Sequence, residues 1–142
     1  MRRLRISIVA GLGLTFGIVL GADTIVCLED ELFGKPAHLA EAKRMLSGLQ
    51  GKTHQVVTGV CLIHLRHRRE KLFAETTHVT FRSLTSEDID RYLSSMNPLD
   101  KAGAYAIQEH GDAIVQDIDG SYSNVVGLPI ERLRAELDGW AS

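Results

Sequence analysis

The sequence predicts an α/β domain in which a mixed, twisted β-sheet is flanked by helices. Segments rich in β-branched residues, partly alternating in polarity, interleave with amphipathic segments of helical period along the chain. At 142 residues the chain is long enough for one domain with one core, and short for two. Its apolar fraction of 44% and charged fraction of 24% are typical of globular domains, which argues against disorder, collagen or a coiled coil.

The first predicted strand is the apolar run GIVLGADTIV, from Gly17 to Val26. Continuous runs rich in valine and isoleucine are typical of strands covered on both faces, so we expect a central, fully buried strand. The residues before it allow another interpretation, because MRRLR and the apolar run up to Ala22 have the outline of a secretory signal peptide. Leu20, three positions before a cut after Ala22, is too large for such a signal. These residues alone leave both interpretations open.

An amphipathic helix is expected next, because HLAEAKRMLSGLQG places apolar residues along one face and ends at Gly51. Two β-branched segments follow, His54 to Arg66 and Lys71 to Arg82, and their pattern indicates an antiparallel pair. The basic stretch HLRHRREK lies at their junction and is typical of a solvated strand end or turn.

The last third of the chain predicts two helices around a compact segment and a strand. Thr85, with an acidic residue three positions later, predicts a capped helix that Pro98 ends. AGAYAIQ, from Ala102 to Gln108, is compact and rich in small residues. AIVQDIDG, from Ala113 to Gly120, indicates a strand leading into a turn, and a final helix is expected to start near Pro129.

Charge and cysteine content exclude several classes of function. The formal net charge of -2 gives none of the basic footprint that nucleic-acid binders usually carry, so no nucleic-acid partner is expected. Cys27 and Cys61 lack the spacing of a zinc or redox motif and indicate buried free thiols. The six histidines form no metal-ligand pattern.

Three polar side chains are candidates for chemistry. Asp23 stands where open α/β sheets bind ligands, and its carboxylate can hold a divalent metal or accept a proton from water. Lys35, in the next turn, can offer its ammonium group to phosphate oxygens, and Gln108 can read a base edge through its amide. Spacing alone leaves a plainer alternative open, in which Asp23 and Gln108 are capping or packing residues and Lys35 is solvated.

Five sequence blocks, in this order, resemble one known family: GADTIV, GKP, EAKRMLSGLQGKTHQVVTGV, AGAYAIQ and GSYSNVVGLP. The family is the Maf family of nucleotide pyrophosphatases, also called septum formation inhibitor proteins. The resemblance covers residues 17–142 of a single Maf-like domain and leaves residues 1–16 as an atypical N-terminal segment. It implies a cytoplasmic α/β protein, often a homodimer, related in fold to the inosine triphosphate pyrophosphatases. It also implies hydrolysis of nucleoside triphosphates to monophosphate and pyrophosphate.

The resemblance assigns roles to particular residues. Asp23 of GADT matches the family's catalytic proton acceptor, which lies near a divalent metal, usually Mg²⁺. Thr24 and Gln108 match positions that mark the subgroup acting on dTTP and UTP, and Lys35 of GKP matches a lysine that approaches the phosphates. We therefore expect these three residues to bind substrate, while Asp23 activates the water that attacks the α-phosphorus.

Family members begin with a strand and an arginine loop of the form SxSPRR, and this pattern is not found ahead of Asp23. We therefore expect an N-terminally incomplete domain. The alternative function is a catalytically impaired Maf-like remnant that only binds nucleotides or dimerises. If Gly17 to Val26 is the family's core strand, cleavage after Ala22 would destroy it, so neither export nor stable membrane association is expected.

Overall fold

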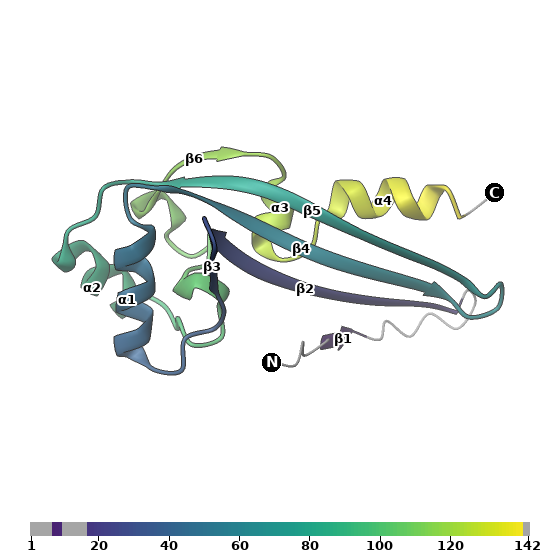
Figure 1. The fold of residues 1–142 in the computed structure, drawn as a ribbon, viewed down its shortest axis with the longest axis horizontal. Helices are drawn as coiled ribbons and strands as arrows, with labels where there is room; N and C mark the ends of the chain where they lie inside the picture. Colours follow the sequence, from purple (N-terminus) through teal and green to yellow (C-terminus); the bar gives the residue numbers. More distant parts are fainter. Residues whose placement is uncertain (1–6, 10–16, 141–142) are drawn as a thin grey trace.

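The computed structural model describes residues 7–9 and 17–140, which form one β-sheet and its flanking helices (Figure 1). The strands are β1 (Ser7–Val9), β2 (Ile18–Leu28), β3 (Glu31–Phe33), β4 (Thr53–His64), β5 (Arg69–Phe81) and β6 (Val115–Asp119). The helices are α1 (Leu39–Leu49), α2 (Ser86–Ser94), α3 (Tyr122–Val126) and α4 (Ile130–Asp138), with short 3-10 turns at Ala102–Ala104 and Gly111–Ala113. The strand order is β1-β2-β4-β5-β6, and β3 also pairs with β2.

The predicted α/β class is confirmed, but the sheet differs from the mixed sheet that the sequence suggested. Each strand pair among the described residues is antiparallel. The reason lies in the connection between β2 and β4. Helix α1 lies at one end of the sheet and does not cross over its face (Figure 1), so the chain re-enters beside β2 from the same end and runs back along it.

Helices cover one face of the sheet. Along β4 the buried residues alternate with accessible ones, as expected for a strand with one covered face. On the covered face, Val56 belongs to a core cluster with α1 and α2, whereas Val60 and Leu62 pack against Leu133 of α4. Figure 1 shows α1 and α2 beside one end of the long β4–β5 pair and α4 alongside its other half.

The opposite face of the sheet carries an open hollow of about 710 Å³, lined among others by Ile25, Val57, Cys61 and Leu72. The expectation of a fully buried strand is therefore wrong for β2, in which Val26 alone is buried. The same geometry explains the cysteines. Both thiols are free, as predicted, but both are only half-buried, and Cys61 faces this hollow.

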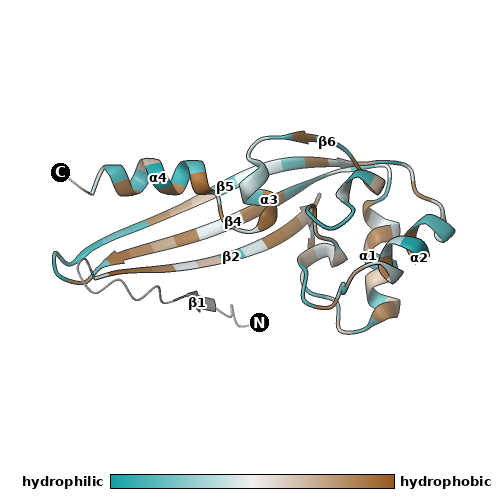
Figure 2. Cartoon of the chain, turned by 180° about the vertical axis from the view of Figure 1, so that it is seen from behind, coloured by the Kyte–Doolittle hydropathy of each residue, from teal (hydrophilic) through white to brown (hydrophobic). Residues whose placement is uncertain are grey.

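Several predicted elements are confirmed in place. The antiparallel β4–β5 pair is present, and its exposed tip, residues 65–68, lies within the basic stretch HLRHRREK and is largely hydrophilic in Figure 2. His64, the first residue of the stretch, is the last residue of β4 and is buried. Thr85 caps α2 in a complete capping box, in which its hydroxyl accepts from the Asp88 N–H at 3.1 Å. Helix α4 begins directly after Pro129. Strand β3 and helix α3 were not predicted from the sequence.

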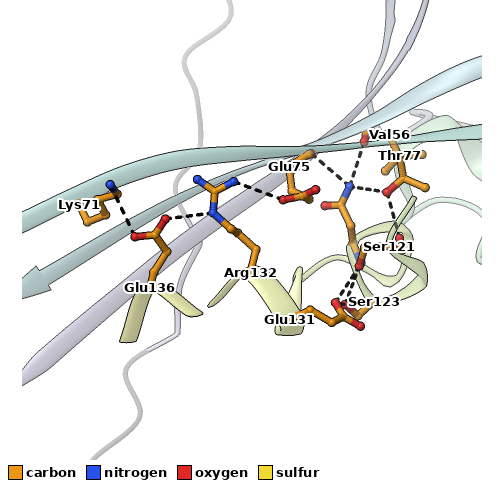
Figure 3. Close-up of polar contacts among 10 residues, drawn as sticks. Val56, Lys71, Glu75, Thr77, Ser121, Ser123, Glu131, Arg132 and Glu136 are labelled. Carbon is orange, nitrogen blue, oxygen red and sulfur yellow. Dashed lines mark hydrogen bonds and ion pairs between the residues drawn. The ribbon is translucent and has the colours of Figure 1, made fainter. Parts of the chain in front are cut away.

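Polar contacts fasten α4 to β5 (Figure 3). Arg132 of α4 lies 3.6 Å from the Glu75 carboxylate of β5 and 3.0 Å from Glu136, which in turn lies 3.6 Å from Lys71. This alternation of charges accounts for the presence of Glu75 on the covered face of β5. In the part of the chain that the structure describes, no helix is long and apolar enough to cross a membrane.

Candidate functional site

One cleft brings together all four residues that the sequence singled out. Asp23, Thr24, Lys35 and Gln108 line a cavity of about 300 Å³ beside β2. Asp23 and Thr24 come from β2 itself, Lys35 from the loop after β3, and Gln108 from the loop after the first 3-10 turn. The residues 125–127 at the end of α3 form a further wall. The site is therefore assembled from four separate segments of the chain.

The cleft lies where one edge of β2 is open. Strand β1 pairs with Leu20 to Ala22, and β3 pairs with Val26 to Leu28. Asp23 to Ile25 fall between these two segments, so among the described residues they have no partner strand on that edge. Main-chain groups and side chains of this short stretch are thus accessible to a ligand, while β4 holds the stretch from the other side.

Asp23 and Thr24 are neighbours that point to opposite faces of β2. The Asp23 carboxylate Oδ1 accepts a hydrogen bond from the Thr24 N–H at 3.0 Å and lies between the cleft and the open hollow, both of which it lines. The Thr24 hydroxyl lies 2.9 Å from the Thr58 hydroxyl on β4 and donates to the Gly127 carbonyl at 3.4 Å. Thr24 therefore ties β2 to the end of α3 as well as lining the cleft.

Asn124 anchors this wall of the cleft from beneath. It is fully buried, and its Nδ2 amide lies 3.1 Å from each of the Val56 carbonyl, the Glu75 carbonyl and the Thr77 hydroxyl. Its own main-chain carbonyl accepts from the Thr58 hydroxyl at 3.4 Å. A five-residue helix has little intrinsic stability, so α3 depends on these contacts for its position.

The segment that carries Gln108 rests on buried aromatic residues. The Tyr92 hydroxyl both donates to the Ala106 carbonyl at 3.2 Å and accepts from the Ala106 N–H at 3.1 Å. Tyr105, which also lines the cleft, has its hydroxyl 2.8 Å from Nε2 of buried His54. Burial raises the pKa of Tyr92 to about 12 and lowers the pKa of His54 to about 4. These groups are thus neutral near pH 7 and act as hydrogen-bonding supports.

The lysine loop and the glutamine segment are joined through the main chain. The Gly103 N–H donates to the Gly34 carbonyl at 3.1 Å, one residue before Lys35. Gly103 has φ +71°, and a Cβ atom there would lie 3.2 Å from Cγ2 of Val26. Only glycine combines this left-handed backbone with so close an approach to β2.

Sequence reasoning did not identify Asp100 and Lys101, which also line the cleft. They precede AGAYAIQ directly, and the Lys101 ammonium lies 3.1 Å from the Asp100 carboxylate. The nearness of these residues to Lys35 depends on the contact between Gly34 and Gly103, which no local pattern reveals.

Two carboxylates of the cleft are of the type that binds divalent metal ions. Asp23 and Asp100 both line it. No group of three or more His, Cys, Asp or Glu side chains suited to a metal ion occurs within residues 7–9 and 17–140. Mg²⁺ usually takes one or two carboxylates and completes its shell with water and substrate phosphates. Two carboxylates alone would leave most of the coordination shell of such an ion to water or to a ligand, so the described donors do not form an all-protein metal cage.

Comparisons with known proteins point to one family. The model of the family described as "Maf-like protein" matches residues 6–140. Proteins named dTTP/UTP pyrophosphatase from Bacillus cereus (strain AH187) and Bacillus anthracis are each 56% identical to this chain over 120 residues. Each alignment covers 84% of this chain and 62% of the relative. The chain thus spans less than two thirds of the length of the relatives that it matches.

Proposed function

Because the chain belongs to the Maf-like protein family, we propose that it is a nucleoside triphosphate diphosphatase, which hydrolyses a nucleotide to its monophosphate and pyrophosphate. The observation that carries this proposal is the single cleft on which Asp23, Thr24, Lys35 and Gln108 meet. A carboxylate, a lysine and an amide on one small cavity suit the three parts of such a substrate, namely the attacking water, the phosphates and the base.

The proposed substrates are dTTP and UTP. Two observations support this choice. The relatives that match over 120 residues carry the name dTTP/UTP pyrophosphatase. Thr24 and Gln108, which match the family positions that mark this subgroup, line the same cleft. The exposed Gln108 amide has both a donor and an acceptor for the edge of a pyrimidine.

In the proposed reaction, Asp23 acts as the proton acceptor. Its carboxylate orients a water molecule and takes one proton from it as the water oxygen bonds to the α-phosphorus. The bond from the α-phosphorus to the oxygen bridging to the β-phosphorus breaks, and pyrophosphate leaves with that oxygen and its electron pair. Lys35 offsets the negative charge of the phosphates in the transition state.

A divalent metal, proposed to be Mg²⁺, would be held by Asp23 together with the phosphates. When bound, it would supply Lewis-acid neutralisation of phosphate charge. The proposal includes a cytoplasmic location and a homodimer, both of which rest on the family resemblance alone.

The test is the release of pyrophosphate from dTTP and UTP by the purified chain in the presence of Mg²⁺. Asp23→Asn is expected to lower the rate by about 100-fold to 10,000-fold, the range for loss of a general base. Asp90→Asn is the matched control, because Asp90 is half-exposed and pairs with Lys43 of α1, outside the cleft.

The outcomes separate the proposal from its alternative. Pyrophosphate release that is lost in Asp23→Asn and kept in Asp90→Asn supports the enzyme. No release at high protein concentration, together with binding of dTTP, would instead favour the catalytically impaired remnant that only binds nucleotides.

A further inference from the structure

Lys101 is an unusual lysine for the surface of this molecule. Its side chain is only 27% exposed, although lysine side chains in folded proteins are mostly exposed. It lines the same cleft as Lys35, and its ion-pair partner is Asp100, its own neighbour in the chain. An ion pair between adjacent residues joins no two elements of the fold, so it does not explain why the lysine is held there.

Another lysine in the molecule shows the contrast. Lys43 of α1 lies 2.8 Å from Asp90 of α2, and this pair connects two helices with both side chains about half exposed. That arrangement is an ordinary surface salt bridge. Lys101, by comparison, lines a cavity and pairs only with the residue next to it in the chain.

The main chain places Lys101 close to the loop that carries Lys35. The Lys101 carbonyl accepts a hydrogen bond from the Ala104 N–H at 3.1 Å, which closes the turn containing Gly103. The Gly103 N–H in turn donates to the Gly34 carbonyl. Two lysines are thus brought to one cleft by connected loops. The Asp23 and Asp100 carboxylates line the same cleft and balance the two lysines, and the negative charge of a bound polyphosphate would attract both ammonium groups.

We propose that Lys101 is a second phosphate contact of the cleft, whose ammonium group leaves Asp100 for the oxygens of the bound triphosphate. This inference rests on the proposed function. Lysine is a compact charge with three donors on a flexible stem, so it can exchange one carboxylate for phosphate oxygens without a rearrangement of the loop. The segment Asp100 to Gln108 then contacts the substrate at both ends, the phosphates through Lys101 and the base through Gln108.

A consequence is discrimination by phosphate number. Two lysines contribute more binding free energy to a triphosphate than to a monophosphate, because the negative charge of the triphosphate is larger and extends further along the cleft. Loss of Lys101 should therefore weaken binding of dTTP more than binding of dTMP.

The experiment measures binding of the α,β-imido analogue of dTTP, which resists hydrolysis at the α-phosphorus, and of dTMP, in Mg²⁺ by calorimetry. Lys101→Met is expected to weaken binding of the triphosphate by about 10- to 100-fold, the effect of losing a hydrogen bond to a charged group. Lys101→Arg should restore most of this loss, and Lys43→Met is the control for removal of a paired lysine elsewhere. A variant that is merely misfolded would lose both ligands to the same extent, whereas loss of a phosphate contact lowers the ratio of triphosphate to monophosphate affinity.

The results distinguish this inference from the function on which it rests. A wild-type chain that binds the triphosphate analogue, with an unchanged affinity ratio in Lys101→Met, overturns the role of Lys101 and leaves the proposed function standing. A wild-type chain that binds neither ligand overturns both. The inference is supported if Lys101→Met lowers the ratio of triphosphate to monophosphate affinity, Lys101→Arg restores it, and Lys43→Met leaves it unchanged.

Discussion

Replacing Asn124 by alanine is expected to loosen the wall of the cleft and destabilise the whole fold. Its Nδ2 amide is the hydrogen-bond donor that reaches Val56, Glu75 and Thr77 from α3, and the side chain is fully buried. Alanine has no amide, so the acceptors on β4 and β5 lose this hydrogen-bond donor. No water can easily replace the amide, because the position is closed to solvent.

The expected cost is about 3 kcal/mol. The amide has two N–H groups, and each hydrogen bond contributes roughly 1 kcal/mol net, to which the penalty of an unsatisfied buried carbonyl adds about 1 to 3 kcal/mol. For a chain of this size such a loss lowers the melting temperature by about 10 °C. Asn124→Asp should be at least as unfavourable near pH 7, since a carboxylate would face the Val56 and Glu75 carbonyls.

The assay is urea unfolding of wild type, Asn124→Ala and Asn97→Ala, followed by circular dichroism. Asn97 is exposed, and its Oδ1 accepts from the Leu99 N–H at 3.2 Å, so its replacement should cost less than about 1 kcal/mol. Equal free energies of unfolding for the two alanine variants would refute the reasoning that α3 is held by the Asn124 amide.

Three further predictions concern the supports of the cleft. Because burial lowers the pKa of His54 from 6.5 to about 4, the unfolded chain binds a proton there before the folded chain does as the pH falls. The free energy of unfolding should therefore fall by about 3 kcal/mol between pH 6.5 and pH 4 on account of this residue. Urea unfolding of wild type and His54→Gln across that range measures this contribution as the difference between their pH dependences. Gly103→Ala should destabilise the fold by about 1 to 2 kcal/mol because Gly103 has a positive φ, whereas Gly48→Ala in helix α1 should stabilise it by about 0.5 to 1 kcal/mol. Melting temperatures that shift in the same direction for both variants would contradict this. Gln108→Ala should raise KM for dTTP with little change in kcat, and steady-state kinetics in which kcat falls instead would place Gln108 in the chemical step.

The sequence predicted the elements whose signals are local. Helix α2 carries its own capping box at Thr85, and β4, as well as β5 from Phe73 onward, shows the alternation of a strand with one covered face. Strand β3 and helix α3 could not be predicted in this way. They have three and five residues, too few for a periodic pattern, and α3 is held by contacts from Asn124 to distant strands.

The candidate site shows the same division between local and distant signals. Asp23, Thr24, Lys35 and Gln108 belong to short sequence blocks that resemble the family, so the sequence alone predicts them as site residues. Asp100 and Lys101 are adjacent to such a block, but their place on the cleft follows from a main-chain hydrogen bond across 69 positions, between Gly34 and Gly103. The antiparallel sheet likewise follows from the position of α1 at the end of the sheet, which a residue pattern does not record.

The proposed function requires that this cleft direct water to the α-phosphorus of a nucleoside triphosphate. The most direct measurement is hydrolysis of dTTP in water labelled with a heavy oxygen isotope, followed by mass spectrometry of both products. If the cleft acts in this way, the label enters dTMP, pyrophosphate remains unlabelled, and Asp23→Asn suppresses both products. Label in pyrophosphate, or release of orthophosphate with dTDP, would contradict it.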